Sequence, residues 1–183
     1  MQLKTIDKLD DKLWPQALHL YHQSFSKETR KTDAIIVGMF TKRMTLLQVL
    51  LDGSDVQAMA ITGLSNDGKL LLIDYLAVRE ELRGKGIGQQ FVGILQQWAA
   101  KEKRLDGILI EVESEPTLNN QQRIRFWESC GFHLTEYIHQ YTWVPEPYQA
   151  MYLAINKEAG VANDGEKLFR HITSFHKRAY SKS

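Results

Sequence analysis

Six consecutive residues lie between a strand-like and a helix-like segment, and their types suit the binding of an anion. They are Arg83, Gly84, Lys85, Gly86, Ile87 and Gly88. Glycine adopts the positive φ angles that turn backbone N–H groups inward onto an anion. The residues that follow are predicted to be helical, and the first N–H groups of a helix carry its positive dipole end. Together with two basic side chains, these groups are typical of a phosphate or pyrophosphate site.

Two well-known phosphate loops fit this segment poorly. A dinucleotide-binding fingerprint needs G-x-G-x-x-G directly at the end of the first strand of a βαβ unit. Here the spacing is G-x-G-x-G, and residues 79–82 stand between the predicted strand and Arg83. A P-loop needs G-K-[ST], which is absent. Taken alone, the segment is also compatible with a plain turn that joins a strand to a helix.

Length and composition are those of a globular domain with one core. The chain has 183 residues, of which 43% are hydrophobic and 25% are charged. Its formal net charge of +1 favours neither nucleic acid nor an anionic membrane, so neither is an expected partner. The basic C-terminal tail has one amphipathic face and no aromatic platform, which favours packing or a homodimer over RNA binding.

The cysteine and histidine content argues against disulfides and metal sites, and the N-terminal residues indicate where the protein is located. The single cysteine, Cys130, excludes an internal disulfide framework and a multi-cysteine metal site. The six histidines show no ligand spacing, so no metal is expected. Residues 1–12 mix charged and apolar types, unlike a signal peptide, and no apolar run approaches the roughly 20 residues that span a bilayer. A cytoplasmic location is therefore expected.

The predicted elements place the glycine segment inside an α+β domain. Turn-rich separators at 52–55 and 65–68 predict antiparallel strands before it, because Asp67-Gly68 is typical of a hairpin. Gly131, followed by Phe132, predicts the end of a later helix. The expected elements are strands at 1–6, 46–51, 56–64, 69–78, 107–113, 132–141 and 148–155, and helices at 10–24, 32–40, 87–98, 119–130 and from 164.

The glycine segment resembles the acetyl-CoA signature of the GCN5-related N-acetyltransferase (GNAT) family, whose loop reads Arg/Gln-x-x-Gly-x-Gly/Ala. Arg83, Gly86 and Gly88 take its three defining positions. Residues 123–132, RIRFWESCGF, are similar to the family's later R-x-x-x-F-Y-x-x-x-G-F motif. The likeness covers about residues 1–155, taken as the acetyltransferase domain, and leaves 156–183 as a C-terminal helical extension.

The resemblance implies both a fold and an activity. The fold is a mixed, mostly antiparallel sheet of about seven strands with about four helices, besides the helical tail. The activity is transfer of the acetyl group of acetyl-CoA, a co-substrate, to a primary amine by direct attack in a ternary complex. The acceptor would be a small molecule or a peptide. Residues 24–31 of this chain lie where such enzymes often have a loop on the acceptor side.

The resemblance also implies how acetyl-CoA is held. Backbone N–H groups of residues 83–88 would bind the pyrophosphate, and the preceding strand would pair with the pantetheine arm as an added strand does. That pairing needs strands 73–78 and 107–113 to separate into a V-shaped slot. An N–H of Leu76 or Ala77 would then receive the oxyanion of the tetrahedral intermediate.

A later helix is expected to complete the cofactor site. Asn119 and Arg123 would touch the pantetheine or the 3′-phosphate end, and Phe126 would pack on the arm. A helix cap is the alternative for Asn119. The expected cofactor contacts are thus Leu76, Ala77, Val78, Arg83, Gly84, Lys85, Gly86, Ile87, Gly88, Asn119, Arg123 and Phe126.

The reaction needs a base, because an alkyl amine is mostly protonated at neutral pH and cannot attack a thioester in that form. Strand alternation puts Glu111 and Glu113 on one face, where mutual repulsion and partial burial suit a base. Glu111 is the expected base, and Asp74 is a further candidate. The alternative is a solvated Glu113 with Glu111 paired to Arg123 or Arg125.

Trp127 departs from the family pattern. Many relatives have a tyrosine there that protonates the departing thiolate, and an indole is not an acid at this pH. Tyr137 or Tyr141 is expected to substitute, with Tyr75 as a third candidate, unless the thiolate leaves unaided because its thiol has a pKa of about 8.5. The same departure motivates a second function, a non-catalytic acyl-CoA sensor or interaction module.

Overall fold

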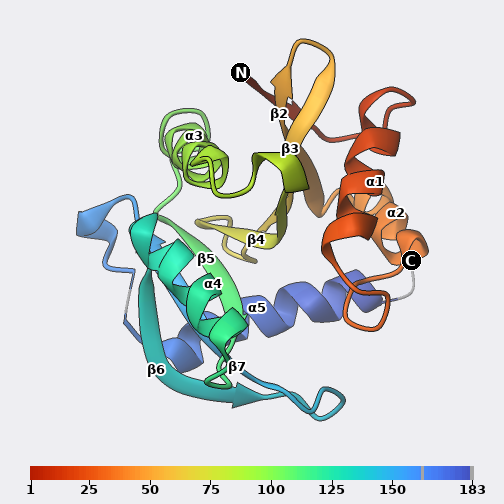
Figure 1. Ribbon diagram of the computed structural model, residues 1–183. Helices are drawn as coiled ribbons and strands as arrows, with labels where there is room; N and C mark the ends of the chain where they lie inside the picture. Colours follow the sequence, from red (N-terminus) through yellow and green to blue (C-terminus); the bar gives the residue numbers. More distant parts are fainter. Residues whose placement is uncertain (162, 182–183) are drawn as a thin grey trace. The chain divides into compact units, whose positions relative to one another are not determined.

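A computed structural model describes residues 1–161 and 163–181. Its seven strands form one sheet in the order β1-β2-β3-β4-β5-β7-β6 (Figure 1). The elements are β1 Gln2–Ile6, α1 Leu13–Ser24, α2 Asp33–Thr41, β2 Thr45–Asp52, β3 Asp55–Leu64, β4 Leu70–Val78, α3 Ile87–Lys101, β5 Gly107–Glu113, α4 Leu118–Ser129, β6 His133–Gln140, β7 Pro147–Ala154 and α5 Gly165–Tyr180. The α+β class and the expected elements are confirmed, with small shifts at their ends.

Two compact units share these elements. The first unit comprises residues 1–63, 73–94 and 176–183, and the second comprises residues 64–72 and 95–175. Strand β4 and helices α3 and α5 therefore each contribute residues to both units. The expected boundary near residue 155 stays a prediction.

The first unit contains an antiparallel sheet and two helices with apolar faces. β1 pairs with β2, and β2 pairs with β3 from Thr45↔Gly63 onward. The side chains of Tyr21 in α1 and of Ile36 in α2 are fully buried. α2 begins where the side chain of Thr32, its N-cap, accepts a hydrogen bond from the backbone N–H of Ile35.

The second unit contains the crossover half of the fold. β4 and β5 run parallel, pairing Leu70↔Gly107 through Leu72↔Leu109. β7 pairs antiparallel with both β5 and β6, so it lies between them. The sequence did not predict this position, because hydrophobic periodicity identifies strands without saying which strands are neighbours.

The turn at the end of α4 is the one expected from Gly131 and Phe132. The backbone N–H of Gly131 donates to Glu128 O and that of Phe132 donates to Trp127 O, the two bonds of a Schellman motif. Gly131 has a φ of 92°, in the left-handed region. The rings of Trp127 and Phe132 meet at 5.0 Å and supply the hydrophobic contact of the motif.

Replacement of Gly131 by alanine should therefore destabilise the protein by about 1–2 kcal/mol, because left-handed backbone is costly for a residue with a Cβ. The added Cβ would also lie 3.3 Å from Leu153 Cδ1. Gly93→Ala is the control, since this glycine lies within α3 and a Cβ there meets no heavy atom within 4 Å. Urea unfolding should show a gain of about 0.5–1 kcal/mol for Gly93→Ala, and equal losses in both variants would contradict the account.

The C-terminal helix α5 has the buried face that its helical spacing predicts. Leu168, Ile172, Phe175 and Ala179 are each at most 4% exposed. At its end, Lys42 Nζ donates to the carbonyl oxygens of Arg178, Ala179 and Ser181 at 2.6–3.1 Å. A lysine in this place satisfies terminal carbonyl groups and interacts favourably with the helix dipole.

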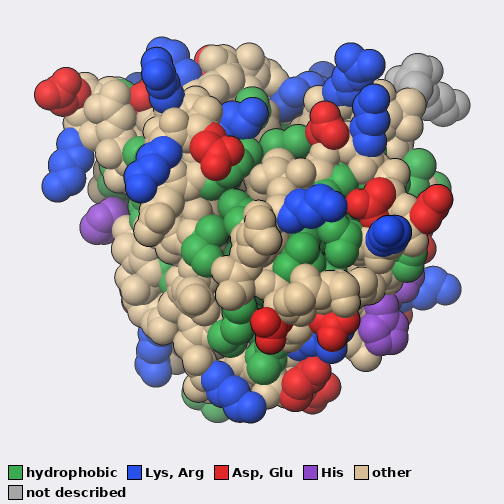
Figure 2. Space-filling view, turned by 90° about the horizontal axis from the view of Figure 1, so that it is seen from above, with side chains coloured by type: hydrophobic (Ala, Val, Ile, Leu, Met, Phe, Trp, Pro, Cys, Tyr) green, Lys and Arg blue, Asp and Glu red, His purple; other side chains and the backbone are tan. Residues whose placement is uncertain are grey.

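Charged side chains of both signs are interspersed on the surface that Figure 2 shows, as the small net charge leads one to expect. Among the described residues, no helix is both long enough and apolar enough to cross a membrane.

Candidate functional site

The glycine segment between β4 and α3 has the left-handed backbone that anion binding needs. Gly84 has a φ of 72° and Gly86 a φ of 79°. A Cβ built at either glycine would meet no heavy atom within 4 Å, so backbone conformation rather than crowding favours glycine. Gly88 lies in the first turn of α3. The segment thus ends at a helix N-terminus, where backbone N–H groups point outward.

The side chain of Arg83 ties the glycine segment to the end of β4 and to the end of α1. Its Nε donates to Val78 O at 3.0 Å and its Nη2 to Ser24 Oγ at 3.1 Å. The sequence predicts Arg83 as a phosphate ligand, and the structure shows that it also fixes the shape of the loop. Lys85 is exposed. Val78 O accepts one hydrogen bond from Arg83, and the expected strand contacts of pantetheine at Leu76, Ala77 and Val78 stay predictions.

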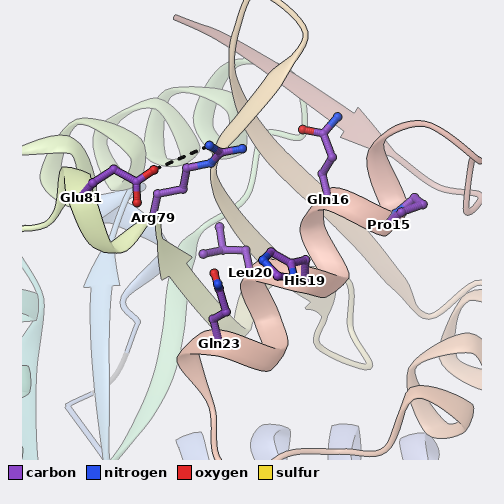
Figure 3. A pocket seen from close by; sticks show the side chains of 7 residues that line it. All are labelled: Pro15, Gln16, His19, Leu20, Gln23, Arg79 and Glu81. Atoms are coloured by element: carbon purple, nitrogen blue, oxygen red, sulfur yellow. Dashed lines mark ion pairs between the residues drawn. The ribbon is translucent and has the colours of Figure 1, made fainter.

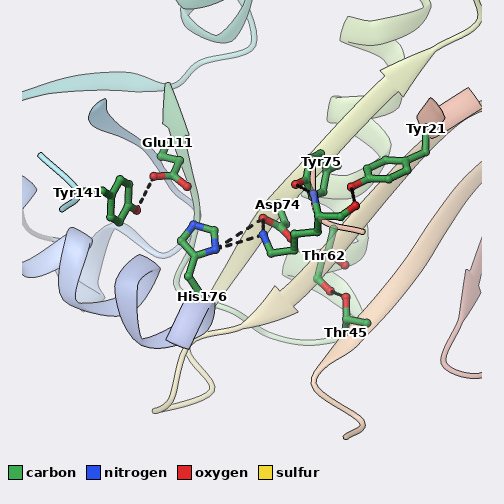
Figure 4. Close-up of polar contacts among 9 residues, drawn as sticks. Tyr21, Thr45, Thr62, Asp74, Tyr75, Glu111, Tyr141 and His176 are labelled. Carbon is green, nitrogen blue, oxygen red and sulfur yellow. Dashed lines mark hydrogen bonds and ion pairs between the residues drawn. The ribbon is translucent and has the colours of Figure 1, made fainter. Parts of the chain in front are cut away.

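A carboxylate and a phenol meet in the second unit. Tyr141 donates a hydrogen bond from its hydroxyl to Glu111 Oε2 at 2.7 Å (Figure 4). Tyr141 is 8% exposed, and Glu111 is partly buried. Arg123 Nη1 lies 3.9 Å from Glu113 Oε1. The salt bridge of Arg123 is thus to Glu113, which the alternative had as solvated, and the hydrogen bond joins two of the three predicted catalytic residues, Glu111 and Tyr141.

The other tyrosine candidates have different partners. Tyr137 is 37% exposed and its hydroxyl lies 3.3 Å from His139 Nδ1. Burial, with the Asp74 charge second, raises the pKa of Tyr75 far above its usual range. Its hydroxyl accepts a hydrogen bond from the backbone N–H of Lys31 at 2.9 Å. A phenol with so high a pKa is a poor proton donor at neutral pH, which disfavours Tyr75 as the acid.

Asp74 on β4, the second base candidate, lies in a buried ion pair. Lys31 Nζ is 2.8 Å from Asp74 Oδ1, and each side chain is 4% exposed. His176 from α5 brings Nδ1 to 3.2 Å from Lys31 Nζ and 4.0 Å from Asp74 Oδ1. Sequence analysis missed this cluster, because its members are far apart in the chain and no local pattern joins them.

Comparison with known proteins decides the family. A sequence model of the acetyltransferase (GNAT) family matches residues 6–132, which is more than half of the chain. The chain belongs to the GNAT acetyltransferase family. Among curated proteins, none matches it.

Solved structures show the same fold. A GNAT-family acetyltransferase from Bacteroides thetaiotaomicron is 18% identical with a TM-score of 0.74, over 97% of this chain and 95% of its own. The ribosomal-protein-S18-alanine N-acetyltransferase of Escherichia coli is 19% identical with a TM-score of 0.61, over 84% and 94%. A Bacillus subtilis acetyltransferase in complex with CoA is 15% identical with a TM-score of 0.58, over 84% and 97%.

Trp127 is where this chain departs from the GNAT motif, and the structure gives the position a packing role. Its side chain is 7% exposed, and its ring contacts those of Phe126 at 5.2 Å and Phe132 at 5.0 Å.

The alternative role of Asn119 as a helix cap is wrong, because Thr117 is the N-cap of α4 and accepts a hydrogen bond from the N–H of Asn120.

A cavity of about 460 Å³ lies in the first unit, beside the segment that leads to the glycine loop (Figure 3). One face of α1 contributes Gln16, His19, Leu20 and Gln23, whose spacing is helical. Arg79, paired with Glu81 at 3.6 Å, contributes the opposite wall.

Among the described residues, no group of three or more His, Cys, Asp or Glu side chains could hold a metal ion.

His139, next to the Glu111–Tyr141 pair, should make stability depend on pH. Its ring stacks on Phe169 at 4.4 Å and 15°, and burial lowers the pKa of His139. The unfolded chain, with a histidine pKa of about 6.5, then binds a proton more readily than the folded one. The stabilisation from a neutral His139 is complete above that pH and is lost as the pH falls toward the folded pKa.

Unfolding free energies of the parent and of His139→Gln, compared between about pH 7.5 and about pH 5.5, test this. The variant should lose less stability on acidification than the parent does. His133→Gln, at an exposed position on the same strand, is the control and should behave like the parent. An unchanged pH dependence in His139→Gln would show that another group is responsible.

Proposed function

We propose that this chain is an N-acetyltransferase that moves the acetyl group of acetyl-CoA to a primary amine. One observation carries the proposal. Within the region matched by the family, β4 ends in a loop with two left-handed glycines that leads directly into the N-terminus of α3. This arrangement suits the pyrophosphate of a nucleotide cofactor. The Bacillus subtilis relative is in complex with CoA, which supports the same ligand here.

The order of the segments gives the cofactor a direction. With the pyrophosphate at residues 83–88, the pantetheine arm runs back along β4 past Val78 and Leu76. Its thioester end then points toward Tyr75 and Asp74. The cavity of Figure 3 adjoins Arg79 and Glu81, which are nearer the phosphate end, so we do not place the acceptor there.

Proton transfer is assigned to the pair in the second unit. Glu111 takes one proton from the acceptor ammonium, and the amine lone pair forms the new bond to the acetyl carbon. The second proton leaves the nitrogen for solvent as the amide forms. The C–S bond breaks and its electron pair leaves with sulfur as the CoA thiolate. Tyr141, which hydrogen-bonds Glu111, gives its proton to the thiolate and regains one from Glu111. Tyr141 thereby replaces the acid that Trp127 cannot supply.

The acceptor is proposed only as a class, a primary amine on a small molecule or a peptide. The Escherichia coli relative is named for an alanine of a ribosomal protein. Another relative is a spermidine N-acetyltransferase chimera, 13% identical with a TM-score of 0.67, over 87% of this chain and all of its own. The two names thus cover a protein and a small molecule, the two forms of acceptor proposed here.

Gly86→Glu should abolish acetyl-CoA binding, because a carboxylate on the loop repels the pyrophosphate and the new side chain strains a left-handed position. Gly53→Glu is the matched control. This glycine has a φ of 60° in the β2–β3 turn and equally open surroundings. Calorimetry with acetyl-CoA should show binding for the parent and Gly53→Glu and none for Gly86→Glu. Retained affinity in Gly86→Glu would refute the loop assignment.

Glu111→Gln should keep acetyl-CoA binding and lower acceptor-dependent release of CoA by about 10²–10⁴-fold, the usual contribution of a general base. Release of free thiol would be followed in a screen of polyamines, amino acids, amino sugars and peptides. Tyr141→Phe should also slow release while binding persists. If the parent binds acetyl-CoA and no amine stimulates release, the non-catalytic acyl-CoA sensor that Trp127 suggests becomes the better account.

A further inference from the structure

Lys31 carries a buried primary amine, and its backbone N–H, its carbonyl and its Nζ are all hydrogen-bonded. Its backbone N–H donates to Tyr75 Oη at 2.9 Å, and its carbonyl accepts from Tyr21 Oη at 2.8 Å. Its Nζ donates to Asp74 Oδ1 at 2.8 Å. The Nζ also lies 5.2 Å from the ring centre of Tyr75 and 5.8 Å from that of Tyr180. A carboxylate and two aromatic rings form a receptor for an alkylammonium group.

The cluster of Lys31, Asp74 and His176 has two features that a purely structural ion pair does not require. Asp74 Oδ2 is buried and has no hydrogen-bond partner in the described part of the chain. A buried carboxylate that serves only to pair with a lysine is expected to have both oxygens satisfied. His176 Nδ1, 3.2 Å from Lys31 Nζ, is a ring nitrogen that can accept a proton from the ammonium. With Asp74 Oδ1 at 4.0 Å, the imidazolium formed would have a counter-ion.

The amine is also attached to the strand that carries the cofactor arm. Asp74 precedes Leu76 by two residues on β4, a rise of about 7 Å along a strand. Under the proposed function, on which this inference rests, the thioester end of acetyl-CoA points toward Asp74. Lys31 Nζ is thus an amine of the chain itself at the reactive end of its cofactor.

We infer that Lys31 is a site of self-acetylation. Lys31 Nζ gives one proton to His176 Nδ1, and its lone pair forms an N–C bond with the acetyl carbon of bound acetyl-CoA. The C–S bond breaks, its electron pair leaves as the CoA thiolate, and the imidazolium returns the proton to that thiolate. The second proton of the former ammonium leaves the nitrogen for solvent as the amide forms. The products are Nε-acetyllysine at position 31 and free CoA. No oxidant, metal or further co-reactant takes part.

Acetylation also changes the cluster that surrounds it. The amide that forms has no charge, so Asp74 loses its cation while it stays buried. The α1–α2 loop, held to β4 through Lys31, and the end of α5, held through His176, both lose a contact. We therefore expect the acetylated protein to melt at a lower temperature than the unmodified one.

Incubation of the purified full chain with acetyl-CoA, without any acceptor, tests the inference. Intact-mass and peptide mass spectrometry should show one acetyl group, at Lys31. Lys42 is the control within the same molecule, because its Nζ donates to three backbone carbonyl oxygens. Acetylation of Lys42 or of exposed lysines at the same rate would show non-specific chemistry and overturn the inference.

Two variants and one binding measurement separate the outcomes. Lys31→Arg keeps a cation beside Asp74 and should take up no acetyl group at position 31. His176→Gln retains the amine and should slow its acetylation by about 10²-fold, as expected for loss of a proton acceptor. If calorimetry shows acetyl-CoA binding while Lys31 stays unmodified, self-acetylation is refuted and the proposed function stands. If acetyl-CoA does not bind at all, both fail.

Discussion

The left-handed backbone between β4 and α3 is the constraint on which the functional account depends. Gly84 and Gly86 hold φ angles of 72° and 79° that a residue with a Cβ adopts only at a cost. They allow the chain to pass from a strand into a helix N-terminus with little side-chain cover. Arg83 fixes the turn by bonding back to Val78 and Ser24. The result is a run of left-handed backbone, a conformation that suits a bound phosphate.

Two polar arrangements show how each unit holds charges away from water. In the first unit the Lys31–Asp74 pair is almost fully buried and is joined by His176. In the second unit Tyr141 donates to Glu111, while Tyr148 lies close enough to Glu113, Glu111 and Glu146 that these charges add to burial and raise the pKa of Tyr148 to about 12. Such groups are costly to bury without partners, and here Asp74 is paired with Lys31 and Glu111 with Tyr141.

The C-terminal extension contributes to the first of these arrangements although it lies beyond the residues that the family model matches. His176 reaches the buried pair, and Lys42 bonds the last carbonyls of α5. Helix α5 is therefore part of the packed structure rather than an appendage. This also accounts for the apolar face of the tail, which is buried within the chain itself.

Much of the fold could be predicted from local patterns, since alternation, helical spacing and turn residues act over a few positions. Asp67-Gly68 and Gly131 each took the predicted role. Contacts between distant segments could not be predicted in this way. The meeting of Lys31 with His176, and the place of β7 between β5 and β6, depend on tertiary packing. Asn119 shows a local limit, because Thr117 two residues earlier competes for the same capping role.

A crystal structure of the full chain grown with coenzyme A tests the central claim most directly. The account predicts that the pyrophosphate accepts hydrogen bonds from backbone N–H groups of residues 84–88, with the pantetheine arm lying along β4 at Leu76. Coenzyme A bound elsewhere, for example in the cavity lined by His19 and Arg79, would contradict it.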